Sequence, residues 1–210
     1  MLNPFIANTF YHVYNRAIGN EKAFLNNENY RFFLQKIKHY IEPIANMYCY
    51  CLLPNHYHLL LSIKDETAIN QYKEILQNHE KLLGNFTTTE AFVLQQFSNM
   101  GNSYTKAFNK MHSRKGRLFM ESLQRKEITS DLYFTKVVHY IHANAVQHGL
   151  VKNLLDWQHS SYNSLISNAP TLLQREKVFE WFGSKEKFIR FHNETPIDLK
   201  MSLEDYTFLH

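Results

Sequence analysis

The sequence predicts an α+β protein built on a ferredoxin-like, split β-α-β antiparallel sheet, with helices on one face and a C-terminal helical extension. Three observations support this prediction. Short aromatic and β-branched runs alternate with segments whose apolar residues recur at helical spacing. These runs follow one another in the order β-α-β-β-α-β, and a third helix comes after them. Finally, 210 residues with a hydrophobic fraction of 44% can bury one full core.

The first part of the chain supplies three strands and one helix. Asn26 or Asn27 can cap the helix at its start, and Pro43 stops it. Pro54-Asn55 provides a tight turn, so the strands on either side of it should form an antiparallel hairpin. The expected elements are a strand over 10–16, a helix over 27–41, and strands over 45–53 and 56–63.

The second part begins with a polar segment, about 65–90, which we interpret as a partly helical insertion. In the helix that follows, Gly101-Asn102 could cause an interruption. Ser130-Asp131 can cap the third helix, and Gly149 ends it. The expected elements are a helix over 91–112, a strand over 117–128, a helix over 132–148 and an amphipathic stretch over 176–191. We predict a main domain over 1–165 and a C-terminal helical extension over 166–210.

Positive charge is concentrated in one region. The whole chain carries a net charge of +4, but residues 104–126 alone carry +6, which leaves about −2 for the rest. Such a cluster favours a polyanionic partner, although a solvated helix face can look the same. The candidate DNA-binding residues are Lys106, Lys110, Arg114, Lys115, Arg117, Arg125 and Lys126.

Cys49 and Cys51 lie on one predicted strand, which is poor geometry for a disulfide, and C-x-C alone is not a zinc motif. We therefore expect two buried thiols in a reducing cytoplasm. No apolar run is long enough to span a membrane, and residues 1–5 do not resemble a secretory signal.

The segment from Leu52 to Leu61 contains two histidines two residues apart, His56 and His58, in an otherwise apolar run. Residues i and i+2 of a strand point to the same face, so both imidazoles should lie side by side. One metal ion or one phosphate group would satisfy both of them. The alternative is two core histidines hydrogen-bonded to backbone, and the pair alone does not decide between these interpretations.

On the third predicted helix, Tyr140 and Asn144 are four residues apart and therefore share a face. If that face meets the histidine pair, two imidazoles and an amide oxygen could bind a divalent metal with open positions. The tyrosine hydroxyl could then act as a nucleophile towards phosphorus. A tyrosine that merely packs, with an asparagine as a cap, is the better interpretation of this spacing taken alone.

Several segments together resemble the HUH-superfamily single-tyrosine transposases, in particular the REP-associated tyrosine transposases. They are, in order, YHVYNR, CLLPNHYHLLL, NSYTKAFNKMHSRKGRLF, YIHANAVQHGLV and WQHSSY. The resemblance covers about residues 10–165, and EWFGSKEKFIRFH near the C-terminal end is similar to a tail found in one subgroup.

The resemblance implies a function and a site. His56 and His58 match the histidine ligands of a divalent metal, Mg²⁺ or Mn²⁺, and Asn144 matches the residue that completes the metal site. Tyr140 matches the nucleophile that forms a 5′-phosphotyrosine and releases a 3′-hydroxyl. The basic region matches the surface that grips single-stranded or hairpin DNA. The implied protein is a prokaryotic, cytoplasmic, nucleoid-associated enzyme, a monomer or a homodimer, with no membrane partner.

The sequence departs from the family pattern in two places. The usual Asn-Pro-Val-Arg after the tyrosine is Asn144-Ala145-Val146-Gln147, which removes a possible phosphate contact. Met120 and Leu123 stand where glutamine and an aromatic residue are expected. Two alternatives stay open: a catalytically idle or domesticated DNA-binding protein on the same fold, and a metallohydrolase of another class. Leu59-Leu60-Leu61 directly after the histidines, with no further ligands, speaks against the hydrolase.

Overall fold

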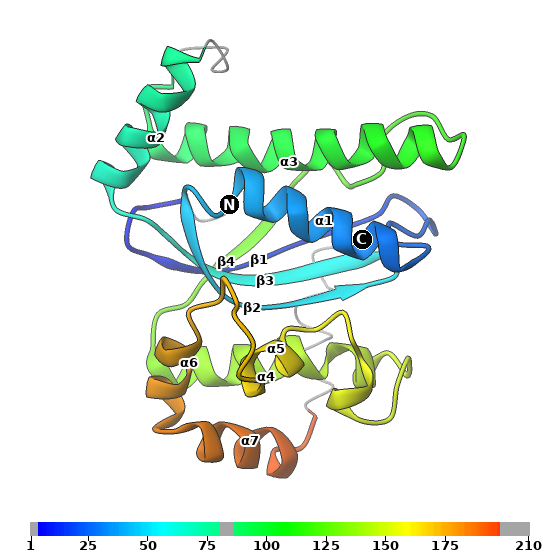
Figure 1. Ribbon diagram of the computed structural model, residues 1–210, viewed down its shortest axis with the longest axis vertical. Helices are drawn as coiled ribbons and strands as arrows, with labels where there is room; N and C mark the ends of the chain where they lie inside the picture. The colour runs from blue at the N-terminus through cyan, green and yellow to red at the C-terminus, as the bar shows by residue number, and fades with distance from the viewer. Residues whose placement is uncertain (1–3, 80–85, 198–210) are drawn as a thin grey trace.

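The computed structural model describes residues 4–79 and 86–197, and these form a sheet covered by helices on both faces (Figure 1). The sheet is antiparallel, of order β2-β3-β1-β4, and consists of β1 (Phe10–Arg16), β2 (Ala45–Leu53), β3 (His56–Ile63) and β4 (Gln124–Glu127). One face carries α1 (Asn27–Tyr40) and α3 (Thr89–Met111), with α2 (Glu66–Asn78) beside α3. The other carries α4 (Asp131–Gln147), a 3₁₀ turn (Leu154–Asp156), α5 (Tyr162–Ile166), α6 (Arg175–Phe182) and α7 (Lys185–Glu194).

This element order and strand order confirm the predicted ferredoxin-like α+β fold. The helices were predicted on one face, which holds for α1 and α3, whereas α4 packs on the opposite face. The strands of the β2–β3 hairpin begin and end at the predicted residues, because Pro54-Asn55 leaves room only for a tight turn. Helix starts follow side-chain caps: Asn26 accepts a hydrogen bond from the Asn29 amide at 3.0 Å, and Ser130 accepts one from the Tyr133 amide at 3.2 Å.

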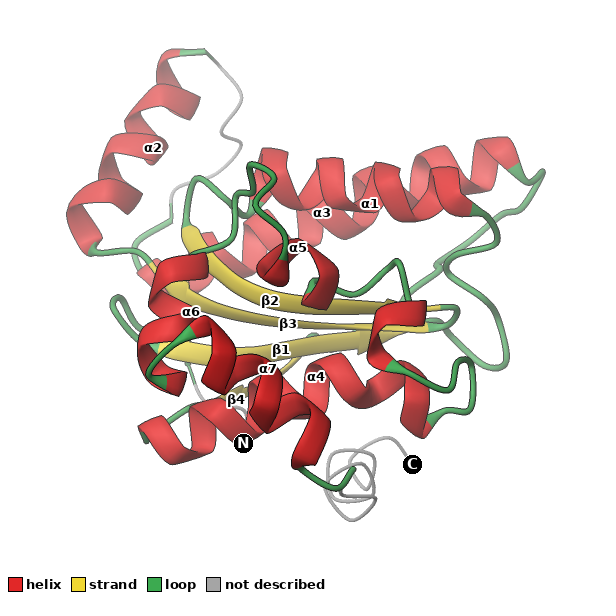
Figure 2. Cartoon of the chain, turned by 60° about the horizontal axis from the view of Figure 1, so that its bottom comes forward, coloured by secondary structure: helices red, strands yellow, loops and turns green. Residues whose placement is uncertain are grey.

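The sheet separates two hydrophobic cores. Alternate residues of β3, such as Tyr57 and Leu59, enter the first core together with Phe33 of α1 and Phe97 of α3. Leu60 enters the second, between the sheet and α4, α6 and α7 (Figure 2). The second core is closed by aromatic side chains of α4 and the C-terminal helices, including Phe134, Tyr162 and Phe188.

Three predicted elements differ from the structure. The last strand spans only Gln124–Glu127, not 117–128, because residues 113–123 form turns and irregular chain, with an isolated bridge between Ala17 and Phe119. The stretch 176–191 contains two helices, α6 and α7, separated at Gly183, whose φ of 84° suits glycine. The α3 helix runs through Gly101 without interruption. The predicted insertion contains α2, and its residues 80–85 lie outside the described residues.

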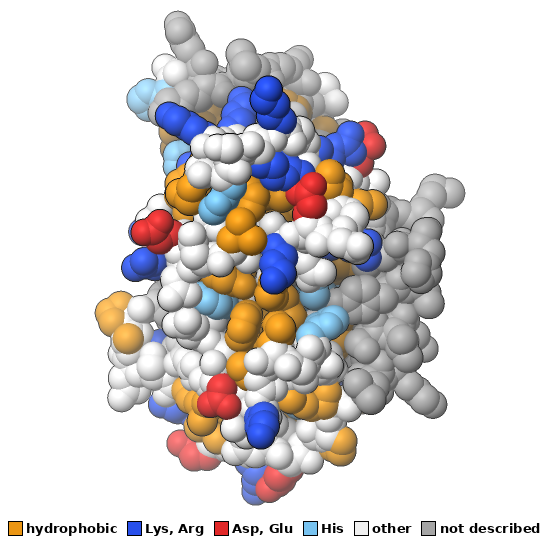
Figure 3. Space-filling model, turned by 90° about the vertical axis from the view of Figure 1, so that its right-hand side faces the viewer, with side chains coloured by type: hydrophobic (Ala, Val, Ile, Leu, Met, Phe, Trp, Pro, Cys, Tyr) orange, Lys and Arg blue, Asp and Glu red, His pale blue; other side chains and the backbone are white. Residues whose placement is uncertain are grey.

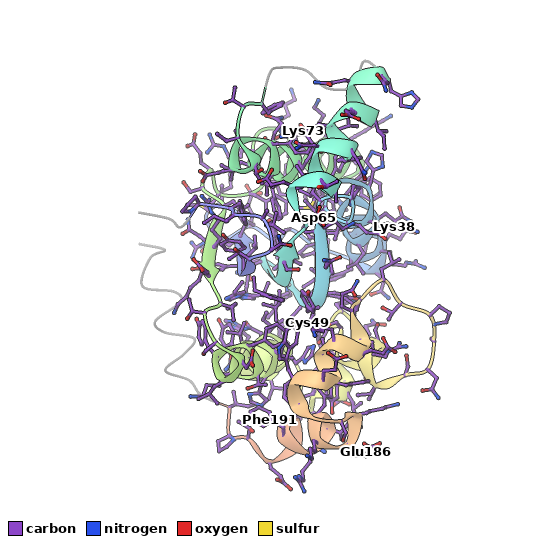
Figure 4. All side chains as sticks on the ribbon, turned by 90° about the vertical axis from the view of Figure 1, so that its left-hand side faces the viewer. Lys38, Cys49, Asp65, Lys73, Glu186 and Phe191 are labelled. Atoms are coloured by element: carbon purple, nitrogen blue, oxygen red, sulfur yellow. The ribbon has the colours of Figure 1, made fainter. Side chains whose placement is uncertain are left out.

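Cys49 and Cys51 are buried, free thiols, as predicted. Figure 4 shows Cys49 on the side of the sheet that faces α6 and α7, and both thiols belong to the second core. Burial raises the pKa of each thiol, which keeps them protonated and unreactive. Within the described residues, no helix has both the length and the apolar character required to cross a bilayer.

Candidate active site

Strand β3 and helix α4 bring the candidate site residues together. His56 and His58 project from β3 towards α4, while Tyr57 between them points into the first core. Both histidines are buried, and their ring centroids lie 5.1 Å apart. The period of two along a strand therefore places both imidazoles on one face, as the sequence predicts.

Helix α4 brings Tyr140 to the same point. Its ring lies 5.6 Å from the ring of His58, in an edge-to-face arrangement, and the side chain is only 2% exposed. Tyr140 can reach the histidines because α4 packs across the sheet, with Val137 and Ile141 in the second core. The predicted nucleophile and the predicted ligand pair are therefore neighbours in space, although 82 residues separate His58 from Tyr140 in the chain.

Asn144 lies one helical turn after Tyr140. Its amide nitrogen donates a long hydrogen bond of 3.4 Å to the Tyr140 carbonyl. The Asn144 Oδ1 is buried and makes no hydrogen bond of normal geometry with any described residue. The amide nevertheless lies close enough to His56 to favour the charged form of that imidazole, so Asn144 and His56 face one another.

The donor types of this cluster, imidazole nitrogens and an amide oxygen, fit a divalent cation. The Nδ1 of His56 lies 2.7 Å from Asn55 Oδ1 and donates to it, which leaves Nε2 with a lone pair. The Nε2 of His58 is buried without a hydrogen-bond partner in the described chain, like Asn144 Oδ1. Residues 4–79 and 86–197 contain no group of three His, Cys, Asp or Glu side chains that could hold a metal. The candidate ligand set is therefore two imidazoles and one amide oxygen.

Burial keeps these imidazoles neutral. Desolvation lowers the pKa of His56 to about 3, helped by the nearby His148. Desolvation also holds the pKa of His58 well below its usual range, with further contributions from His12 and His56. A neutral imidazole has a lone pair to offer a metal, whereas an imidazolium has none. At neutral pH both histidines are thus in the form that a cation requires.

Sequence reasoning missed two histidines of this cluster. His12 on β1 is 1% exposed, and its Nε2 lies 2.9 Å from His58 Nδ1. His148, the C-cap residue that follows α4, has its ring 5.1 Å from that of His56. The alternation of Phe10, His12 and Tyr14 along β1 indicated that His12 shares a face with aromatic residues. The strand register, which pairs Tyr14 with His58, is needed to show that His12 contacts His58.

The structure separates the predicted DNA-binding residues into two groups. Arg114 bonds to Glu21 at 2.5 Å and also to Asn109 and the backbone of its own turn. Arg125 is buried, bonds to Glu90 at 2.6 Å and packs over the Phe5 ring. These two side chains are thus engaged within the protein. The others are exposed: Lys106, Lys110, Lys115, Arg117 and Lys126.

A groove of about 800 Å³ runs between α3 and residues 116–125. Lys106 and Arg117 line it, and Asn15 of β1 lies at its sheet side. Asn15 directly precedes Arg16, which pairs with His56 on the neighbouring strand. The groove thus reaches the end of the sheet where the histidine pair begins. Figure 3 faces the corresponding side of the molecule, where His side chains lie among hydrophobic ones and several Lys and Arg side chains lie above them.

The fold and the site together define a ferredoxin-like protein with a histidine pair on the sheet and a tyrosine on the covering helix. The structure is similar to a solved structure described as a REP-associated tyrosine transposase bound to a REP hairpin. The TM-score is 0.57 at 13% sequence identity, and the match covers 83% of this chain and 93% of that chain. The two proteins therefore share a fold. The sequence matches no protein-family model and no curated protein.

Proposed function

We propose that this protein is a metal-dependent DNA strand transferase that cleaves and rejoins single-stranded or hairpin DNA through a covalent tyrosine intermediate. One observation supports this most directly: His58 Nε2 and Asn144 Oδ1 are buried without hydrogen-bond partners of normal geometry, and His58 packs against the ring of Tyr140, one helical turn before Asn144. Buried polar atoms are normally satisfied, so such a pair beside a potential nucleophile favours a ligand site. The shared fold with a hairpin-bound transposase agrees with this proposal.

In the proposed reaction, the Tyr140 Oη attacks a phosphodiester phosphorus of DNA. An Oη–P bond forms, the P–O3′ bond breaks, and the phenol proton leaves so that the 3′ oxygen ends as a hydroxyl. Attack by a 3′-hydroxyl on the phosphotyrosine then reverses these bond changes and rejoins the strand. His56, His58 and Asn144 would hold a divalent cation, Mg²⁺ or Mn²⁺, which when bound polarises a phosphate oxygen and neutralises charge developing at phosphorus.

The exposed cations would hold the DNA backbone. Lys106 and Arg117 line the groove that reaches the site end of the sheet. Lys126 of β4 pairs with His12 of β1, and β1 is the strand next to β3 and its histidine pair. Cations placed in this way neutralise phosphates without reading bases. We therefore assign affinity to these residues and chemistry to the buried cluster.

A catalytically idle DNA-binding protein on the same fold is the second candidate, and one observation favours it. Tyr140 is 2% exposed, so a phosphate can reach its hydroxyl only after neighbouring side chains move. An idle protein would never need that movement. The two candidates therefore differ in whether hairpin DNA becomes attached to Tyr140.

The test uses a DNA hairpin with single-stranded flanks, labelled at either end and incubated with the full chain and Mn²⁺ or Mg²⁺. A 5′-phosphotyrosine links the protein to the 3′ part of the strand, so only the 3′ label should migrate with the protein. Chelation by EDTA should abolish this adduct, and peptide mapping should place it on Tyr140. Hairpin binding without any adduct would support the idle protein. Cleavage to a free 5′-phosphate without an adduct would indicate a hydrolase.

A further inference from the structure

His12 of β1 is a buried side chain within hydrogen-bond distance of His58, one of the two proposed ligands. The pairing of β1 with β3 sets Tyr14 opposite His58, so His12, two residues earlier, lies on the same face and diagonal to His58. The two rings are 5.0 Å apart and inclined by 27°, and His12 Nε2 lies 2.9 Å from His58 Nδ1. Both residues are almost completely buried, so water does not compete for this hydrogen bond.

The hydrogen bond between these rings can run in two directions. If His12 Nε2–H donates, a neutral His58 carries its own proton on Nε2, and that buried N–H has no acceptor among the described residues. If His58 Nδ1–H donates to His12, the Nε2 of His58 is a bare lone pair. His12 is 1% exposed, and the Nε2 of a neutral imidazole there can accept the proton of His58 Nδ1. Only the second direction leaves a ligand atom.

We propose that His12 is a positioning residue, which accepts a hydrogen bond from His58 Nδ1 and thereby holds the His58 Nε2 lone pair ready for the divalent cation. This inference rests on the proposed function, because it assumes that His58 is a ligand. Metal-bound histidines commonly donate their second ring nitrogen to an outer partner, which fixes the tautomer and the ring orientation. Asn55 makes the corresponding contact to His56, so each imidazole of the pair has its own partner.

The first measurement needs no variant of His12. Nitrogen-15 NMR of the metal-free protein at neutral pH distinguishes the two tautomers of His58, and a His58→Gln variant assigns the signals. We expect a protonated Nδ1 and a bare Nε2. A proton on Nε2 would overturn the inference, whether or not the protein cleaves DNA.

The second measurement is Mn²⁺ affinity, followed by the EPR signal of free Mn²⁺. His12→Leu removes the acceptor while keeping an apolar side chain in the core, and loss of such an outer partner typically weakens metal binding about 10–100-fold. His12→Gln carries an oxygen near the position of Nε2 and should restore most of the affinity. Tyr14→Leu is the packing control, because the Tyr14 ring also lies 5.6 Å from His58.

The outcomes separate this inference from the proposed function. Equal weakening by His12→Leu and Tyr14→Leu would reduce His12 to a packing residue, as would failure of His12→Gln to bind better than His12→Leu. In either case, Mn²⁺ binding by the unaltered protein that is lost in His56→Ala would leave the proposed metal site standing. If the unaltered protein binds no Mn²⁺, or His56→Ala binds it equally well, the proposed metal site fails and this inference with it.

Discussion

His142 on α4 and His192 on α7 share a hydrogen bond of 2.9 Å between Nδ1 and Nε2. The bond is one step of a buried relay: the Tyr50 amide donates to Ser161 Oγ, Ser161 to His142 Nε2, His142 to His192, and His192 to the Phe188 carbonyl. Each ring nitrogen has one role, so the relay is fully satisfied. It fastens the helix that carries Tyr140 to the C-terminal extension.

Replacing His192 with leucine should destabilise the protein. The variant leaves His142 Nδ1–H buried without an acceptor, which typically costs about 1–3 kcal/mol of the free energy of unfolding. Urea denaturation monitored by tryptophan fluorescence measures this loss. Arg190→Ala, an exposed position on the same helix, is the matched control and should change stability by less than about 0.5 kcal/mol. Equal stability of the two variants would show that the relay contributes nothing.

Tyr140→Phe should abolish formation of the DNA adduct while leaving the fold and hairpin binding intact. The substitution removes one oxygen and almost no volume, so it takes away an interaction needed only for reaction. Gel mobility of the hairpin reports binding, and denaturing electrophoresis reports the adduct. Tyr133→Phe, on the same helix, is the control and should form the adduct normally. An adduct in Tyr140→Phe would assign the nucleophile to another residue.

Arg114 and Lys115 are adjacent cations whose substitution should affect different properties, stability for Arg114 and DNA binding for Lys115. Arg114 bonds to Glu21 and to its own turn, so Arg114→Ala should reduce the free energy of unfolding by about 1–3 kcal/mol. Lys115 is exposed, so Lys115→Ala should keep stability but lower the salt dependence of hairpin binding by about one phosphate contact. Titrations at two salt concentrations test this. An unchanged slope in Lys115→Ala would place the DNA path elsewhere.

Acid should destabilise the metal-free protein. Burial lowers the pKa of His12, His56 and His192 to about 3. Between the unfolded value near 6.5 and about 3, the unfolded chain therefore binds protons that the folded chain does not. The free energy of unfolding is fully present above pH 6.5 and falls as pH is lowered, by up to about 1.4 kcal/mol per pH unit for each such histidine.

Urea denaturation in EDTA at pH 7, 6 and 5 measures this dependence. His192→Leu should show a slope smaller by one proton, since it removes one of the titrating groups. Stability that stays constant from pH 7 to pH 5 would contradict the neutral, buried state of these histidines.

Local patterns predicted three of the four strands and the faces on which the candidate site residues lie, for identifiable reasons. The β2–β3 hairpin has a turn at Pro54-Asn55 and a continuous apolar run, so its register is determined locally. The face shared by His56 and His58 follows from the period of two, and that of Tyr140 and Asn144 from the helical period. Their meeting in space was not determined locally. It was expected from the family resemblance, and the structure shows it.

Contacts between distant segments account for what the sequence did not predict. The turn before the short last strand is held by Arg114, whose partner Glu21 is 93 residues away. His12 and His192 meet their partners across 46 and 50 residues, so no local pattern identifies them. Gly183 was visible in the sequence, but the packing of α6 and α7 into the second core makes it a helix end.

The two faces of β3 constrain how this protein can evolve. His56 and His58 alternate with Tyr57 and Leu59 along β3. The candidate site therefore lies on one face of the strand, and the first core lies on the other. A substitution alters one face at a time, but deletion of a single residue within β3 would exchange the faces beyond it. Insertions and deletions should therefore be tolerated in the connecting loops and selected against within β3. This should hold even where the amino acids at its core positions change.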